Sequence, residues 1–127
     1  VGGHFVFQPG QEVFARQLNP EDARHGKLPL IENRGAQFWV LGLKTEGAKT
    51  IIRQSGPSQT RILGGLFLPL ITGSTKELPL FDIRNGRFDA TAYTAWYTWP
   101  VHASVQGHAD IRTEGKRLES RLLAFPE

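Results

Sequence analysis

One strand-like pattern returns four times along this chain, and this recurrence constrains the fold more than any other feature of the sequence. The four segments begin at residues 12, 37, 60 and 87, so they are 23 to 27 residues apart. A shorter strand precedes the last three, at residues 30–32, 51–53 and 80–82. A two-strand unit of this size cannot bury its apolar face alone, whereas stacking successive units buries a continuous core.

The recurrence also predicts which side chains face that core. Aligning the four long segments at their first residues forms one inward column, made of Ala15, Val40, Leu63 and Ala90. A second column lies beside it, made of Gln17, Gly42, Gly65 and Ala92. A glycine follows each short strand and marks a corner before the long one, at Gly10, Gly35, Gly56 and Gly86. We therefore expect each unit to be a short strand, a tight corner and a long strand.

The rest of the chain favours an all-β fold, because short β-rich runs are broken by glycine, proline and asparagine. Only residues 115–123 have a helical spacing of leucines. We expect strands at Phe5–Phe7, Glu12–Gln17, Leu30–Glu32, Gln37–Leu43, Thr50–Gln54, Thr60–Phe67, Leu80–Ile83, Arg87–Trp99 and Val101–Val105. The prediction is one domain over residues 1–127, a parallel β-helix of about four coils with a less regular section at residues 100–127. The alternative is an antiparallel β-sandwich or jelly roll whose strands resemble one another by chance.

Charge and composition exclude several classes of function. The net charge is +3 and the basic residues are scattered, whereas a nucleic-acid surface requires a concentrated basic stripe. No apolar run approaches the roughly 20 residues of a membrane span. The chain has no cysteine, which removes disulfides and thiolate metal sites. The mild positive charge is compatible with a polyanionic partner such as a uronate-containing polysaccharide.

Residues 37–47 carry a family resemblance. This segment, with the Leu-Gly-Gly strand at residues 62–66 and the Ala-Arg-Gln-Leu-Asn-Pro-Glu run at residues 15–21, resembles the late coils of bacterial pectate-lyase-like β-helix proteins. The resemblance covers roughly residues 12–95. It implies a right-handed β-helix, a secreted protein and a role connected with extracellular polysaccharide. It brings over no catalytic residue, because the active sites of such proteins usually lie on earlier coils. A fragment of a longer β-helix, a subunit of a homo-oligomer and a free-standing module all remain open.

The aromatic cluster at residues 93–99 is the main candidate for binding. Strand alternation places Tyr93, Tyr97 and Trp99 on one face and Trp96 on the other. Flat aromatic rings can contact sugar rings, although the same rings can instead cap the end of the stack. Lys44 and Glu46, at the end of the most distinctive strand, are further candidates for binding a sugar.

Metal binding has weaker support in the sequence. His4, His102 and His108 form the only plausible copper or zinc set, because no metal-binding motif is present. The stacked short strands place Glu32, Arg53 and Asp82 in one column of alternating sign. Two carboxylates do not supply the six to eight oxygens that calcium requires, so this column is read first as a surface ladder of ion pairs.

Three classes of function follow from these observations. The first is a non-catalytic carbohydrate-binding module, without a cofactor. The second is a small polysaccharide-degrading enzyme, namely a lyase, for which calcium would be the metal, a hydrolase, or a metal-dependent oxidative enzyme, for which copper would be the metal. The third is an assembly subunit in which the ends of the coil stacks associate.

Overall fold

The computed structural model describes residues 3–21, 28–47, 49–68, 78–94, 103–105, 108–111 and 121–124, and beyond Thr91 it describes the backbone alone. These residues form strands and contain no helix, so none of the described segments is a helix that could cross a membrane. The strands are β1 (Phe5–Phe7), β2 (Glu12–Leu18), β3 (Ile31–Asn33), β4 (Gln37–Glu46), β5 (Ile52–Gln54), β6 (Gln59–Leu68), β7 (Phe81–Ile83), β8 (Arg87–Thr94), β9 (Ala103–Val105), β10 (His108–Ile111) and β11 (Arg121–Ala124).

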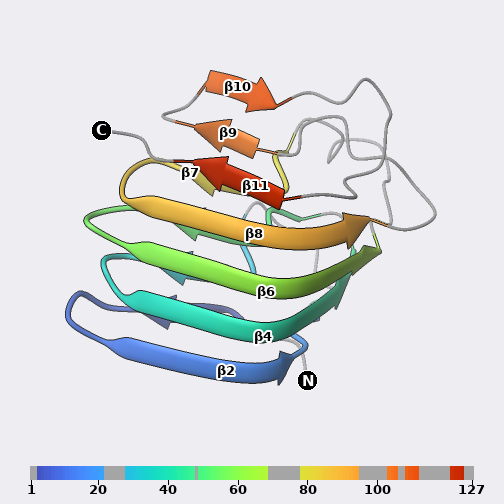
Figure 1. Ribbon diagram of the computed structural model, residues 1–127, viewed down its shortest axis with the longest axis horizontal. Coiled ribbons are helices and arrows are strands. Elements are labelled where there is room, and N and C mark those ends of the chain that lie inside the picture. Colours follow the sequence, from blue (N-terminus) through green and yellow to red (C-terminus); the bar gives the residue numbers. More distant parts are fainter. Residues whose placement is uncertain are drawn as a thin grey trace.

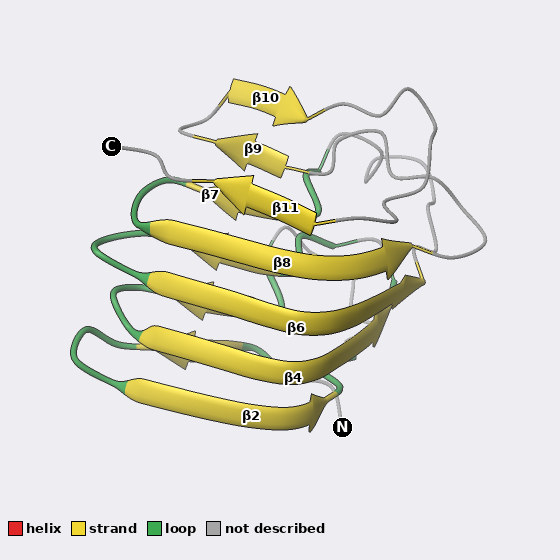
Figure 2. Ribbon diagram, viewed as in Figure 1, coloured by secondary structure: helices red, strands yellow, loops and turns green. Residues whose placement is uncertain are grey.

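The strands form two sheets, and the chain passes from one sheet to the other between consecutive strands from β1 to β9. The short strands form one sheet in the order β1-β3-β5-β7-β9-β10, and the long strands form the other in the order β11-β8-β6-β4-β2. Figure 1 shows the four long strands stacked one above the other, with the short strands behind them. Figure 2 shows green corner loops joining the short and long strands along one side of the stack.

The all-β prediction is confirmed, and the strand pairing is mostly parallel. Neighbours are parallel from β1 to β9 in one sheet and from β2 to β8 in the other. Antiparallel pairs occur where β10 joins β9 and β11 joins β8. An antiparallel sandwich would not contain these parallel ladders. The helical spacing of leucines at residues 115–123 gives no helix where the structure describes it, since residues 121–124 form strand β11 at the edge of β8.

The predicted inward column is correct at three of its four positions. Ala15 of β2 pairs with Val40 of β4, and Ala90 of β8 ends the column as predicted. On β6, however, the residue that pairs with both Val40 and Ala90 is Ile62. Ile62 is fully buried, whereas Leu63, which was expected inside, is 50% exposed. A slip of one residue along a strand moves a side chain to the opposite face, so the alignment at β6 was one residue out of register.

The reason for the slip is a bend that crosses the long strands. Gln17, Gly42 and Gly64 lie at equivalent places between paired residues, and each has a positive φ, of 53°, 80° and 84°. Gly64 is unpaired against β8, where the register shifts between Leu63 and Gly65. The second column is therefore wrong between β4 and β6, where Gly64 and not Gly65 lies beside Gly42, whereas Gly65 does pair with Ala92 of β8 as predicted. Aligning Gly64 with Gly42 would have given the observed register.

The core lies between the two sheets and is built mainly of isoleucine, phenylalanine and leucine. Phe38, Phe67, Phe81 and Phe88 are fully buried. The rings of Phe67 on β6 and Phe81 on β7 lie 5.7 Å apart, so they join the two sheets. The glycines predicted at the corners, Gly10, Gly35, Gly56 and Gly86, all have positive φ, as a tight turn between a short and a long strand requires.

A buried amide organises one of these corners. The Asn33 side chain accepts hydrogen bonds from the backbone N–H groups of Gly35 and Ala36, at 3.3 and 2.8 Å. Its amide group donates to the Ala36 carbonyl and to the Thr60 hydroxyl of the next long strand. Because an unpaired buried amide is costly, these contacts fix the corner and tie it to β6.

Candidate functional site

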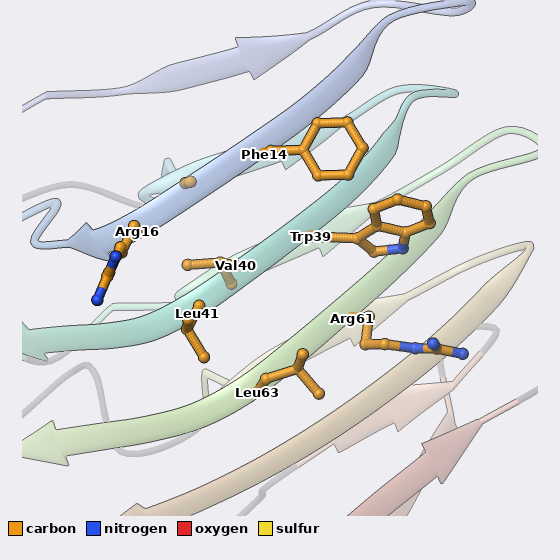
Figure 3. A pocket seen from close by; sticks show the side chains of 8 residues that line it. Phe14, Arg16, Trp39, Val40, Leu41, Arg61 and Leu63 are labelled. Carbon is orange, nitrogen blue, oxygen red and sulfur yellow. The ribbon is translucent and has the colours of Figure 1, made fainter.

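The outward face of the long-strand sheet carries a groove across β2, β4 and β6. Side chains alternate between the two faces of a strand, so the residues between the core positions point to solvent. The groove has a volume of about 450 Å³ and is lined by Phe14, Ala15, Arg16, Trp39, Val40, Leu41, Arg61 and Leu63. Figure 3 shows Phe14, Trp39 and Arg61 projecting from three successive strands on the same side. The groove is therefore a product of the stacking and does not occur within any one strand.

An aromatic pair forms the first row of this groove. Phe14 pairs with Trp39 in the register of β2 and β4, and their ring centroids lie 4.6 Å apart at an interplanar angle of 62°. This edge-to-face arrangement is a favourable one for aromatic rings. Phe14 remains 65% exposed, so a large flat surface stays available to a ligand.

Arginine continues the same row on β6. Trp39 pairs with Arg61, and Arg61 pairs with Asp89 of β8. The Arg61 Nε lies 3.7 Å from an Asp89 carboxylate oxygen, and the Arg61 side chain is 47% exposed. Only the Arg61 side of this pair is exposed, since the Asp89 side chain is 16% exposed. The distance is longer than a hydrogen bond, and a guanidinium has five N–H donors, so Arg61 can also donate to an outside acceptor.

The second row combines aliphatic surface with another arginine. Arg16, Leu41 and Leu63 are neighbours on β2, β4 and β6, and Leu41 and Leu63 are about half exposed. The charged residues that line the groove in the described part of the chain are Arg16 and Arg61, and no carboxylate or histidine lines it. The groove thus offers apolar surface and positive charge, and it has no acid–base pair.

A second, shallower hollow lies past the bend, lined by Gln17, Gly42, Leu43, Lys44, Gly64, Gly65 and Leu66. Of the two residues predicted to bind sugar, Lys44 lines this hollow, and Glu46 contacts Lys44. The Lys44 ammonium contacts the carboxylates of Glu21 and Glu46, each at 2.5 Å. The hydrogen bond from Lys44 lowers the pKa of Glu21, and the hydrogen bonds to Glu21 and then Glu46 raise the pKa of Lys44. These side chains satisfy one another, so they are weaker candidates for a ligand than the groove.

The predicted aromatic platform lies largely beyond the described residues. Tyr93 lies in β8 and its backbone pairs with Leu66, but its side chain is outside the described part. Trp96, Tyr97 and Trp99 are also outside it. Tyr93, Tyr97 and Trp99 therefore stay a prediction.

The histidine set is only partly within the described residues. The His4 Nδ1 lies 2.7 Å from the Pro29 carbonyl oxygen and its Nε2 lies 3.3 Å from a Glu32 carboxylate oxygen. His108 begins β10, described there by its backbone alone, and His102 is outside the described residues. Within the described part of the chain, no three histidine, aspartate or glutamate side chains gather as metal ligands do.

The expected column of alternating charge is present on the short strands. Glu32, Arg53 and Asp82 are neighbours on β3, β5 and β7. The Arg53 Nε donates to an Asp82 carboxylate oxygen at 2.9 Å, and Arg84 contacts the same carboxylate at 3.0 Å. The Glu32 carboxylate is held by Arg34 at 2.6 Å. The guanidinium groups occupy both carboxylates, which agrees with a ladder of ion pairs.

Comparisons with protein-family models, with curated proteins and with solved structures find no match to this chain. The function is accordingly argued from the groove itself. Phe14, Trp39 and Arg61 were not predicted as site residues from the sequence, although each is the third residue of its strand. Aligning the strands at Gly42 and Gly64 would have identified them, because Phe14, Trp39 and Arg61 then fall in one column, each directly before a residue of the inward column.

Proposed function

We propose that this chain is a secreted, right-handed parallel β-helix module of about four coils that binds polysaccharide. The passage of the chain between two parallel ladders supports the β-helix reading. The single observation that carries the binding proposal is the exposed Phe14 ring, packed edge-on against the half-buried Trp39 ring beside Arg61 on an outward face. A linear glycan lying across β2, β4 and β6 contacts the two rings with its C–H surface.

The ligand class follows from the charge of the groove. Arg16 and Arg61 are the charged residues of its described lining, and guanidinium groups bind carboxylates through paired donors. A uronate-containing chain satisfies both the apolar and the charged part of the surface. The absence of a carboxylate from this lining favours binding over hydrolysis of the glycosidic bond at this groove, since that hydrolysis commonly uses a pair of carboxyl groups.

The experiment is affinity gel electrophoresis with polygalacturonate in the gel, applied to the parent and to Phe14→Ala. Stacking on one ring in nucleic-acid modules is worth roughly 1–3 kcal/mol. On that scale we expect Phe14→Ala to weaken retention about tenfold, since about 1.4 kcal/mol is a factor of ten. The melting temperature should change little, because Phe14 is 65% exposed.

The matched control is Phe5→Ala, which removes a ring that is 36% exposed on the short-strand sheet. Phe5→Ala should retain the parent's mobility shift. Equal retention of the parent and Phe14→Ala, or no retention of the parent on any gel containing a uronate or neutral glycan, would contradict the proposal.

A further inference from the structure

The end of the stack at β2 is open, in contrast to the opposite end. Val13, Ala15 and Leu18 of β2 are only half-buried, whereas their partners on β4, namely Phe38, Val40 and Leu43, are fully buried. At the other end β11 covers the edge of β8 and β10 covers the edge of β9. In the described part of the chain no strand pairs with the outer edge of β2, which Figure 1 shows as the last long strand of the stack.

The backbone groups along this free edge can be assigned. The Gln37 N–H donates to the Gln11 carbonyl at 2.9 Å, and along a strand the backbone groups of successive residues point to opposite edges. Gln11, Val13 and Ala15 therefore direct their N–H and C=O groups toward β4. Glu12, Phe14 and Arg16 direct theirs away from it, and such unpaired edge groups favour the addition of another strand.

We propose that β2 pairs antiparallel with β2 of a second copy of this chain, about a two-fold axis at Phe14. Phe14 then lies opposite Phe14 of the other copy, and Glu12 lies opposite Arg16. These three residues are the ones whose backbone groups face the free edge, so they form the hydrogen-bonded pairs of the antiparallel ladder. The opposite charges of Glu12 and Arg16 meet twice by symmetry, and directly opposed unlike charges stabilise such a pair.

The two-fold symmetry of the proposed dimer also follows from the difference between the two ends of the strand stack. A head-to-tail stack would require β2 of one copy to pair with β8 of the next, and β11 already occupies that edge. A two-fold contact uses the same edge from both copies and closes on itself. The contact covers the half-buried Val13 and Ala15, which would lie opposite each other on the core side. The two grooves then meet across the axis at the Phe14 side chains.

Charge reversal at the edge tests this contact, with mass in solution measured by sedimentation equilibrium. The parent should be a dimer. Glu12→Arg and Arg16→Glu each create two pairs of like charges, so each should raise the dimer dissociation constant at least tenfold. The double variant, Glu12→Arg with Arg16→Glu, restores opposite charges and should recover the dimer.

The control is Arg87→Glu, which makes the same charge change as Arg16→Glu. Arg87 lies in the same outward row as Glu12, but on β8, three strands from the free edge of β2. This variant should remain dimeric, and circular dichroism should show all four variants folded. A monomeric parent would overturn the proposal and would leave β2 to some other occupant, such as a further coil. Folded single variants that stay dimeric, or a double variant that stays monomeric, would also overturn it. Mass is independent of glycan retention, so the dimer and the proposed function can fail separately.

Discussion

Glycine at the corners shows how single residues set the shape of this chain. Gly10 and Gly86 have nearly the same φ, of 80° and 84°, and both could be predicted as corner positions because each lies between a short and a long strand. Their surroundings differ and could not be predicted. A Cβ at Gly10 would meet nothing within 4 Å, whereas a Cβ at Gly86 would lie 2.0 Å from the Ser58 carbonyl oxygen. That contact depends on the close approach of two corners, which the local sequence does not encode.

The two glycines give a matched prediction about stability. Gly10→Ala should cost about 1–2 kcal/mol, because an alanine at positive φ is strained. Gly86→Ala adds an atom inside contact distance of a backbone oxygen and should cost at least about 2 kcal/mol more, because the corner must shift. Urea unfolding of the two variants measures the difference. Equal midpoints would show that the corner at Gly86 is not packed against Ser58.

The long strands illustrate what could be predicted at the level of an element. Their existence and their first residues, to within one position, follow from the β-rich runs, whereas their last residues do not. Their order in the sheet follows from the recurrence. The register of β6 was missed, because Gly64 and Gly65 are adjacent and either can be aligned with Gly42. Hydrophobicity alone could not determine which of Ile62 and Leu63 faces the core, since both side chains are apolar. The register is set by the bend at Gln17, Gly42 and Gly64. On β2 the bend lies at a glutamine, so no glycine marks it in the sequence there.

Aspartate substitutions at Ile62 and Leu63 test the corrected register. Ile62→Asp places an unpaired carboxylate in a fully buried position, which should cost several kcal/mol and unfold much of a domain of this size. Leu63→Asp should change the free energy of unfolding by less than about 0.5 kcal/mol, as is usual at exposed positions. Thermal melts followed by circular dichroism distinguish the two. The reverse result, a folded Ile62→Asp and an unfolded Leu63→Asp, would restore the original alignment.

At the scale of the whole molecule, stacking determines which side chains meet. Residues about 25 positions apart become neighbours, so the Phe14–Trp39–Arg61 row has no signature in any short stretch of sequence. The cluster of Tyr93, Tyr97 and Trp99 is conspicuous in sequence because its members are close along the chain. Local clustering therefore directed the prediction to residues 93–99, whereas the described fold gathers an aromatic surface on β2 and β4. The charged column of Glu32, Arg53 and Asp82 could be predicted, because its members lie at the same place in successive short strands.

The most direct test of the binding account is the response of the three tryptophan indole N–H signals to a short oligogalacturonate, followed by ¹H–¹⁵N NMR. The chain has three tryptophans, so each signal can be assigned with one Trp→Phe variant. The groove predicts that the Trp39 indole signal shifts on titration, together with the backbone amides of Phe14 and Arg61, while the Trp96 and Trp99 signals stay in place. Shifts confined to Trp96 and Trp99, with Trp39 unchanged, would contradict the groove as the binding site.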